Sequence, residues 1–382
     1  MFDYWIISVP ADPTCDDTWR KLVQALAKYN DCACFKFYIP TLKAGTLDQL
    51  LLVSDDLARL ETNVENTVNK IAAQLDDLLE NKREEVVESI HADNVTLHHY
   101  LITFKWDMAK YPTRQSIKTI AYLIEKQMSI CDVDLNTKTK SYNTVVNNYA
   151  ASEKKRVGNL LTKYIGDYVS KEDFVLQSEF LTTLVVVVPC TAKESWLNKY
   201  ERLNEDIVPK STKLVKEDNE HALFTVTLFK KSIEPFKLSA KQSGFFVRDF
   251  VYNEQEIFEF RRELYELYQE KQKLYQPFLK FCISNFSECF IALIHVKSCR
   301  VFVESVLRYG LPANFQPILL VIPHKISNKV RRCLDDLYGH LDTMRANKSQ
   351  KKNLEPSAIL EQEYYPYVFT KIKAEIGDIL IK

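Results

Sequence analysis

The sequence has very little glycine. Only 7 of its 382 residues are glycine, which is roughly a quarter of the usual share. The closest two, Gly158 and Gly166, are eight positions apart. A phosphate-binding loop of the G-x-x-x-x-G-K-[ST] type needs clustered glycines, because only glycine lets successive backbone amides point at a phosphate. The sequence therefore excludes ATP hydrolysis by such a loop.

Long hydrophobic runs and net charge are also missing. No stretch approaches the roughly 20 apolar residues of a membrane span, and the first residues, MFDYWIISVPADP, lack the basic region of a signal peptide. Lys plus Arg and Asp plus Glu both number 51, so no net field attracts nucleic acid or an anionic membrane. We expect a cytosolic protein that neither binds nucleic acid nor inserts into a membrane.

Motifs for catalysis and metal binding are absent. The sequence has no H-E-x-x-H, no C-x-x-C and no G-x-S-x-G. His295 and Cys299 are one helical turn apart in an apolar run, but two ligands are too few for a metal, so core packing is expected. The nine cysteines include one close pair, Cys32 and Cys34, and indicate reduced thiols. The sequence predicts no catalytic residue, no metal site and no cofactor.

Long helices follow from what is left. The stretches 46–111 and 113–157 contain neither glycine nor proline. Thr46 and Gln49 have the spacing of a capping box, and apolar residues then recur every three or four positions. The residues from 113 to 157 are predicted to form one long helix with a single apolar seam.

A second long helix is predicted to return beside the first. Asn253 to Glu256 has the pattern of a helix cap, and apolar residues at seam spacing continue up to Pro277 and beyond. Each seam contains one lysine, Lys138 or Lys271. Such a lysine either sets the register of the two helices or extends its ammonium group to water, and the sequence leaves both open.

Strand patterns lie between the helices and at both chain ends. Between the helices they cover 181–188, 224–228 and 246–252, with a helix at 193–204. At the ends they cover 4–9, 34–39, 317–322 and 365–372. Two strands alone are marginally stable, so we expect the early strands to pair with the late ones.

The expected fold is helix-rich α+β with the shape of a dumbbell. A foot is made of residues 1–141 and 278–382, and a head of residues 158–252 is inserted between antiparallel neck helices at 142–157 and 253–277. A polar, basic surface loop is expected at 343–357.

Charge is unevenly distributed along the chain. Residues 46–90 have 11 Asp and Glu against 4 Lys and Arg, whereas residues 297–352 have 11 Lys and Arg against 4 Asp and Glu. Either both segments present solvated helix faces, which is the common case, or the two segments meet in the fold.

Several stretches resemble one protein family. They are ITFKWDMAKYP at 102–112, EDFVLQSEFLTTLVVVVP at 172–189, FVRDFVYNE at 246–254, RVFVESVLRYGLP at 300–312 and QEYYPYV at 362–368. In sequence and order they are similar to the C subunit of the eukaryotic vacuolar-type proton-pumping ATPase, and the resemblance runs from Asp3 to the last strand. It implies the same dumbbell of foot, neck and inserted head.

The resemblance also implies a function. A member of this family is a non-catalytic stator component of the peripheral, ATP-hydrolysing sector. Its head holds a peripheral stalk made of the E and G subunits, and its foot meets another stalk and the cytosolic part of the membrane-bound a-subunit. Its release accompanies reversible disassembly of the pump, and some members are described as binding actin. The implied location is the cytosolic face of acidic-organelle or plasma membranes, reached through the complex.

Two sets of residues are candidates for contacts with partners. At the junction of neck and head they are Lys154, Lys155 and Arg156 with Phe246, Arg248 and Asp249. In the foot they are Arg300, Glu304, Arg308 and Tyr309, which share a helical face. The alternatives are solvated charges in the first set and internal support of the foot in the second.

Other function classes stay open at this point. Charged helices are equally compatible with a cytoskeletal, actin-binding or vesicle-tethering adaptor. A small-molecule enzyme would need a pocket with convergent polar groups. Partners that co-purify with the protein separate the first two classes, and nucleotide binding tests the third.

Overall fold

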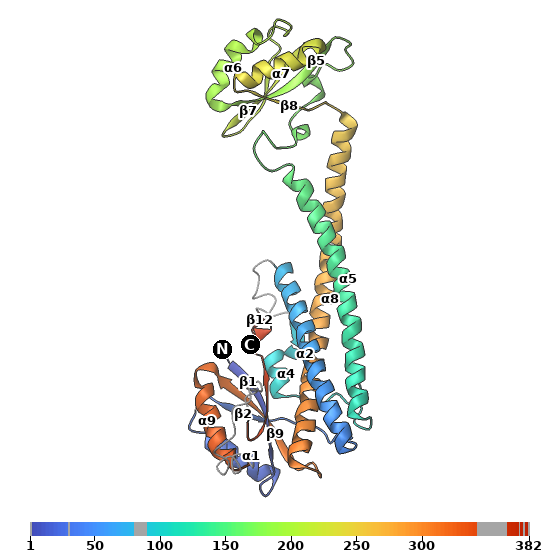
Figure 1. Cartoon of the computed structure of the whole chain (residues 1–382), viewed down its shortest axis with the longest axis vertical. Coiled ribbons are helices and arrows are strands. Elements are labelled where there is room, and N and C mark those ends of the chain that lie inside the picture. Colours follow the sequence, from blue (N-terminus) through green and yellow to red (C-terminus); the bar gives the residue numbers. More distant parts are fainter. Residues whose placement is uncertain are drawn as a thin grey trace, which may run out of the picture. The chain divides into compact units, whose positions relative to one another are not determined.

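The computed structural model describes residues 2–29, 31–79, 90–341, 365–373, 375–376 and 379–380. Helices and strands are both abundant (Figure 1), which confirms the predicted α+β class. The chain divides into two compact units: unit 1 is Met1–Thr139 with Pro277–Lys382, and unit 2 is Lys140–Gln276. The dumbbell and the boundaries of foot, neck and head stay predictions, and the loop predicted at 343–357 lies outside the described residues.

The predicted long helices are present. They are α2 (Leu47–Leu78), α5 (Ile117–Lys154) and α8 (Glu254–Tyr309), and the last two have residues in both units. At the start of α2 the Thr46 hydroxyl accepts the Gln49 N–H at 3.4 Å, and the Gln49 side chain accepts the Thr46 N–H at 3.3 Å. This is the predicted capping box, and it satisfies amide groups that the first turn of a helix leaves without partners.

Helix α8 begins at its predicted cap and continues through Pro277. The Asn253 side chain accepts the Gln255 N–H at 3.1 Å and donates to the Glu256 carboxylate at 2.8 Å. Proline removes one backbone N–H from the helix. Pro277 is exposed, however, so water is available to the carbonyl group that it leaves unbonded. The helix therefore reaches Tyr309 without a break.

The sheet of unit 1 is built from both chain ends. Its strands are β1 (Phe2–Pro10), β2 (Ala33–Lys36), β9 (Phe315–Pro323) and β10 (Val368–Ile372), in the order β10-β1-β9-β2. Tyr4 lies opposite Val321 on one side and opposite Ile372 on the other. All pairs are antiparallel, and the predicted pairing of early with late strands is confirmed.

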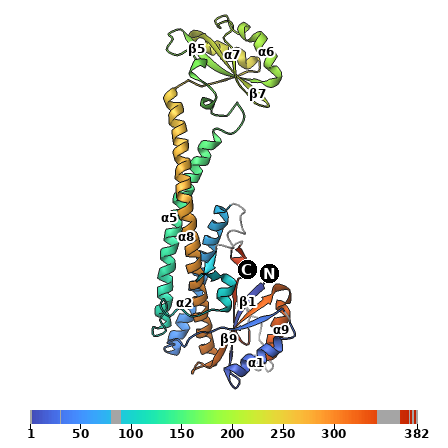
Figure 2. The same cartoon turned by 180° about the vertical axis from the view of Figure 1, so that it is seen from behind.

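Helices cover both faces of this sheet (Figure 2). One face packs against α1 (Cys15–Leu26) and α9 (Ser327–Tyr338). Trp5, Ile7 and Leu320 point to this side, as the strand period of two requires. The next residue along β1, Ser8, points to the opposite face of the sheet. There its hydroxyl accepts a hydrogen bond from Ser305 of α8 at 2.8 Å.

Unit 2 has a four-stranded antiparallel sheet of its own. Its strands are β5 (Leu181–Pro189), β6 (Lys213–Glu217), β7 (His221–Phe229) and β8 (Phe246–Arg248), in the order β6-β7-β5-β8. Its helices are α6 (Lys193–Lys199) and α7 (Ile233–Gln242). Trp196 of α6 and Phe236 of α7 pack on Val186 and Phe224. Val185 packs on the other face, against the segment around Leu160.

Some predicted boundaries were wrong. Strand β6 was not predicted, because its sequence KLVKE is charged and a register shift interrupts its pairing with β7. The strand predicted at 246–252 ends at Arg248, and the helix predicted at 193–204 ends at Lys199, where a 3-10 turn follows. The strand predicted at 34–39 is Ala33–Lys36, and that at 365–372 starts at Val368.

The two sheets share one topology. In unit 2 the order along the chain is β5-α6-β6-β7-α7-β8, and the first strand lies between the fourth and the third. Unit 1 repeats this plan with β1-α1-β2 and β9-α9-β10, although 278 residues separate its halves, from Phe37 to Asn314. This split β-α-β arrangement is of the ferredoxin-like type.

Short elements complete the described part of the chain. They are α4 (Leu97–Ile102), β3 (His91–Ala92), β4 (Val95–Thr96), β11 (Glu375–Ile376), β12 (Ile379–Leu380) and the 3-10 turns Ile165–Asp167, Lys171–Asp173, Cys190–Ala192, Tyr200–Arg202, Lys230–Ser232, His324–Ile326 and Gly339–Leu341. Within the ranges described above, no helix combines the length and the apolar character needed to cross a bilayer.

Candidate interaction sites

The oppositely charged segments of the sequence meet at a buried lysine. Lys297 of α8 is 1% exposed, and its ammonium group bonds the carboxylates of Glu61 and Glu65 on α2. It also donates to the backbone carbonyl of Lys371 on β10 at 3.1 Å. Burial alone would raise the pKa of Glu65, but Lys297 and Lys373 lower it below its usual value. This network joins α2, α8 and the last strand of the sheet.

Two of the predicted foot residues extend that network. Nη1 of Arg300 donates to Glu61 at 2.8 Å, and its Nε donates to Glu304 one turn further along α8 at 2.7 Å. The Arg300 side chain is 35% exposed, so part of the guanidinium group reaches the surface. Arg300 and Glu304 therefore brace α8 against α2.

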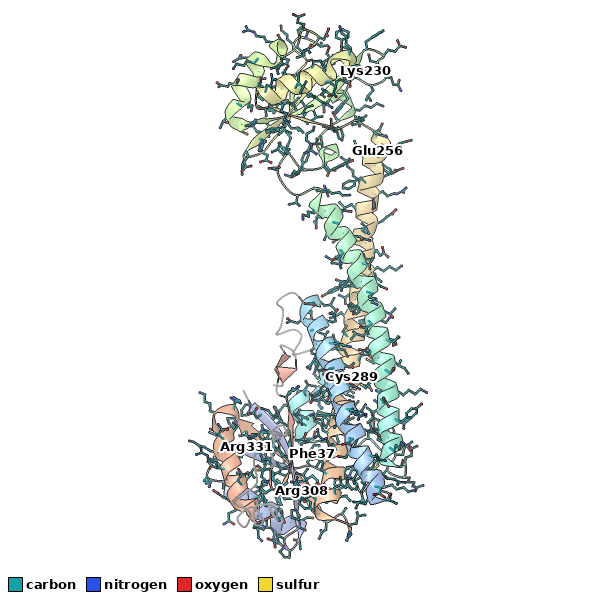
Figure 3. All side chains as sticks on the ribbon, viewed as in Figure 1. Phe37, Lys230, Glu256, Cys289, Arg308 and Arg331 are labelled. Atoms are coloured by element: carbon teal, nitrogen blue, oxygen red, sulfur yellow. The ribbon has the colours of Figure 1, made fainter. Side chains whose placement is uncertain are left out.

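Of the other two foot residues, Tyr309 contacts the sheet and Arg308 contacts the segment that precedes β10. Figure 3 labels Arg308 near the C-terminal end of α8, where its Nη1 donates to the carbonyl of Tyr365 at 3.0 Å. The Tyr309 hydroxyl donates to the carbonyl of Ser8 on β1 at 2.9 Å. All four predicted foot residues thus form hydrogen bonds within unit 1, as the alternative interpretation stated, and of the four Arg308 is exposed. Their contact with a partner protein stays a prediction.

At the end of α5 the predicted basic residues are exposed. Arg156 donates through Nε to Asp167 at 2.7 Å, and Arg261 of α8 donates to the other oxygen of the same carboxylate at 3.1 Å. Among the described residues, the side chains of Lys154 and Lys155 form no ion pair or hydrogen bond. These two ammonium groups are therefore available to a carboxylate of another protein.

The strand residues predicted beside them have different roles. Arg248 donates to the backbone carbonyls of Leu160 and Lys163, at 3.0 and 3.1 Å, and so fixes the segment that covers one face of the sheet. Asp249 forms an ion pair with a lysine of α7. Phe246 is 47% exposed at the edge of the sheet. The ring of Phe246 and the Asp249 side chain, which is 86% exposed, both reach the surface, and contact of this set with a partner stays a prediction.

The predicted core packing of His295 and Cys299 is confirmed, since both side chains are fully buried. The imidazole lies among the rings of Trp106 and Tyr111, and its Nε2 accepts the backbone N–H of Asp107 at 3.0 Å. Among the residues that the structure describes, no three His, Cys, Asp or Glu side chains come together where they would hold a metal.

The two seam lysines each lie over an aromatic ring. The ammonium group of Lys138 is 5.1 Å from the ring of Phe281, and that of Lys271 is 5.4 Å from the ring of Tyr149. Neither lysine is buried. This agrees with the interpretation in which the stem packs on the seam and the charge stays near water.

Comparison with known proteins decides the family. The family model for the C subunit of the V-ATPase matches residues 4–368 of the chain. The chain belongs to the V-ATPase C-subunit family. The match covers the whole sheet of unit 2, strands β2 and β9 and most of β1 in unit 1, and all three long helices, so both units belong to the family fold.

Curated members of the V-ATPase C-subunit family align along nearly their whole length. The V-type proton ATPase C subunit of Manduca sexta is 47% identical over 380 residues, covering 98% of this chain and 99% of its own. The C subunit 1-B of the same pump from Danio rerio is 47% identical, covering 99% and 100%, and the C subunit 1 from Xenopus laevis is 44% identical, covering 98% and 99%. A solved structure of the cytoplasmic N-terminal domain of the V-ATPase I subunit, a homologue of the a-subunit, aligns at 10% identity over 88% of this chain and 97% of its own, with a TM-score of 0.30, too low to indicate a shared fold.

Sequence reasoning missed two features of these sites. The pairing of Lys297 with Glu61 joins residues 236 positions apart, and only the opposite charge of their segments hinted at it. An exposed aromatic face of α8 that includes Phe258 and Tyr265 was also missed. Its seven-residue spacing was visible in the sequence, but the apolar residues of α8 were assigned to a single seam.

Proposed function

We propose that the chain is a non-catalytic stator component of a V-ATPase. It bridges peripheral stalks made of the E and G subunits and the cytosolic part of the membrane-bound a-subunit. In this role it supports ATP-driven proton transport from the cytosolic face of the membrane, and its release accompanies reversible disassembly. The observation that carries the proposal is the match to curated C subunits over 98–99% of the chain.

The two units suit a bridging role. A bridge needs two separate interfaces, each on a body that keeps its shape under load. Each unit has its own sheet with helices or loop segments packed on it, and its own buried core. A partner bound to one unit is therefore supported by a core that does not depend on the partner of the other.

The proposal is tested by purification from cells. We expect a tagged chain to co-purify with the E, G and a-subunits from the membrane fraction. Cells without the chain should acidify their compartments poorly and recover when it is returned. Actin or vesicle-coat proteins in place of pump subunits would instead indicate the cytoskeletal or tethering adaptor.

Charge reversal at the end of α5 should weaken binding to the E–G pair. Lys154→Glu with Lys155→Glu changes two exposed ammonium groups, and we expect about a tenfold loss of affinity because like charges then face the partner. Calorimetric titration with purified E–G heterodimer measures the change. The matched control is Lys199→Glu with Lys241→Glu, which alters two other exposed lysines of unit 2. Equal affinity of the test and control variants would show that Lys154 and Lys155 do not contact the E–G pair.

In unit 1, Arg308→Ala should weaken binding to the cytosolic part of the a-subunit. We expect a loss of at most about tenfold in affinity, because Nη1 of Arg308 already donates to Tyr365 within unit 1 and the partner does not receive the whole fork of donors. Arg308→Lys is the control, since it keeps the charge and loses the fork of donors. We expect its affinity for the a-subunit to lie between those of the original chain and the Arg308→Ala variant. A folded Arg308→Ala protein that binds normally would assign Arg308 to internal support alone.

A further inference from the structure

One face of α8 in unit 2 carries exposed aromatic rings. Phe258 is 65% exposed, Tyr265 63% and Tyr268 43%. At about 3.6 residues per turn, residues 258, 265 and 272 lie almost in line along the helix. Residues 261 and 268 lie beside this line, at heights between those three. This alignment gives the face the spacing of a two-heptad helix contact. It is separate from the seam of Ile257, which is buried.

The composition of this face is that of a binding surface. We call it the aromatic face; its residues are Phe258, Arg261, Arg262, Tyr265, Tyr268, Gln269 and Gln272. None of them is acidic, and Tyr, Phe and Arg are the residue types enriched where proteins meet. Figure 3 labels Glu256 in the first turn of α8, directly before this face begins. Such a surface loses unfavourable contact with water when a partner covers it.

A hollow with a volume of about 300 Å³ adjoins the aromatic face. Tyr149 of α5 lies on one side, and Phe260, Leu264 and Tyr265 of α8 lie on the other. The rings of Tyr149 and Tyr268 have their centroids 6.0 Å apart. This volume accepts one large apolar side chain, such as leucine or an aromatic, from an approaching segment.

The rim of the hollow is positively charged. Asp167 is held by Nε of both Arg156 and Arg261, so two positive charges face one negative charge. Arg261 also donates from Nη2 to the carbonyl of Gly166. In the described part of the chain, both Nη atoms of Arg156 and Nη1 of Arg261 are left to donate to an acceptor. The partner that completes this rim carries carboxylates.

Most acidic residues of α8 in unit 2 occupy a different face; the exception is Glu254, the first residue of the helix, which lies in line with Arg261 and faces Lys171 at 3.8 Å. Glu259, Glu263 and Glu270 are about a quarter to a third of a turn away from the aromatic face, and Glu266 pairs with Arg262 at its edge. The helix is thus divided between an acidic face and a face that combines rings with guanidinium groups. This division favours a partner helix with apolar residues flanked by Asp and Glu.

We propose that the aromatic face docks an acidic amphipathic helix, one apolar side chain of which enters the hollow. The inference rests on the proposed function, under which this helix belongs to the E–G heterodimer. Rings supply the buried area, and Arg156 and Arg261 pair with carboxylates beside the inserted side chain.

The test is a calorimetric titration of the full chain with purified E–G heterodimer. Phe258→Ala with Tyr265→Ala should weaken binding by at least about tenfold, because two exposed rings are lost. The matched control is Glu263→Ala with Glu270→Ala, also seven residues apart and exposed on the same helix, and it should bind within about twofold of the original chain. Circular dichroism checks that every variant is folded.

A second pair of variants tests the charge. Gln269→Glu with Gln272→Glu places carboxylates on the aromatic face without removing apolar area and should weaken binding. Gln269→Lys with Gln272→Lys should strengthen it. If the original chain binds the heterodimer and all variants bind equally, the aromatic face is not the docking site, and the proposed function stands. If the original chain does not bind the heterodimer at all, both the proposed function and this inference are wrong.

Discussion

Replacement of Lys297 by methionine should lower the free energy of unfolding of unit 1 by about 3 kcal/mol. The ammonium group of Lys297 is buried between Glu61 and Glu65, and methionine has similar length without the charge. Removal of the lysine leaves buried carboxylates without their main counter-charge. The free-energy cost of these unpaired charges exceeds the net stabilisation that the ion pair provides. We expect the lower end of the usual range, because Arg300 and Lys373 still face these carboxylates.

Urea denaturation followed by tryptophan fluorescence measures this loss. Three of the four tryptophans lie in unit 1, so a Trp196→Phe background makes the fluorescence signal specific to it. Lys373→Met is the matched control: this lysine pairs with the same Glu65, but its side chain is 60% exposed, so its removal should cost less than about 1 kcal/mol. Equal losses in the two variants would show that burial does not set the strength of this network.

Acid should destabilise unit 1 through His295. Its Nε2 accepts the Asp107 N–H, and its Nδ1 donates to the carbonyl of Ile291 at 2.8 Å. A protonated imidazole has no acceptor for the first of these bonds, and burial separates its charge from the water that would solvate it. Burial accordingly lowers the pKa of His295 from 6.5 to about 4.

The direction of the pH effect follows from these values. Well above pH 6.5 the imidazole is neutral in both the folded and the unfolded state, and His295 causes no loss of stability. As the pH falls from 6.5 to about 4, only the unfolded state takes up the proton, so stability decreases by about 1.4 kcal/mol per pH unit. The total loss is about 3 kcal/mol, and it levels off below the folded pKa.

A comparison of two proteins isolates this effect. In His295→Gln the amide retains one acceptor and one donor and does not titrate. Urea midpoints of both proteins from about pH 7 to about pH 4 should diverge, the original chain losing more. Burial raises the pKa values of Asp3 and Glu65, but neighbouring basic side chains lower both below their usual values. Protonation of these two carboxylates in acid destabilises both proteins equally, so their effect cancels. Parallel curves would contradict the prediction.

The long helices and the strands at the chain ends were predictable from sequence because both depend on local signals, and the pairing of those strands followed because two strands alone are only marginally stable. A lack of glycine and proline, the cap at Thr46 and alternating apolar residues act within a few positions. Strand β6 was not predictable in this way, since three of its five residues are charged. The common topology of the two sheets was also hidden, because topology is conserved by packing rather than by any repeated residue pattern.

The candidate sites were predictable in part. Charge and position pointed to Lys154 and Lys155, whose side chains the structure leaves exposed. The sequence could not separate Arg300 as a partner contact from Arg300 as a brace, since its counter-charge Glu61 lies 239 positions away. Pairs so distant are set by how the helices pack, and no local pattern encodes them.

The sheet of unit 1 also fixes the order in which the chain can fold during synthesis. Tyr4 leaves the ribosome long before its neighbour Ile372, which lies 368 positions later in the chain. Strand β1 therefore waits for β9 and β10, while residues 140–276, which form unit 2, emerge together and can close their own sheet first. A nascent chain that stops before β9 exposes the apolar side of β1, so chaperones that bind such strands should engage it throughout translation.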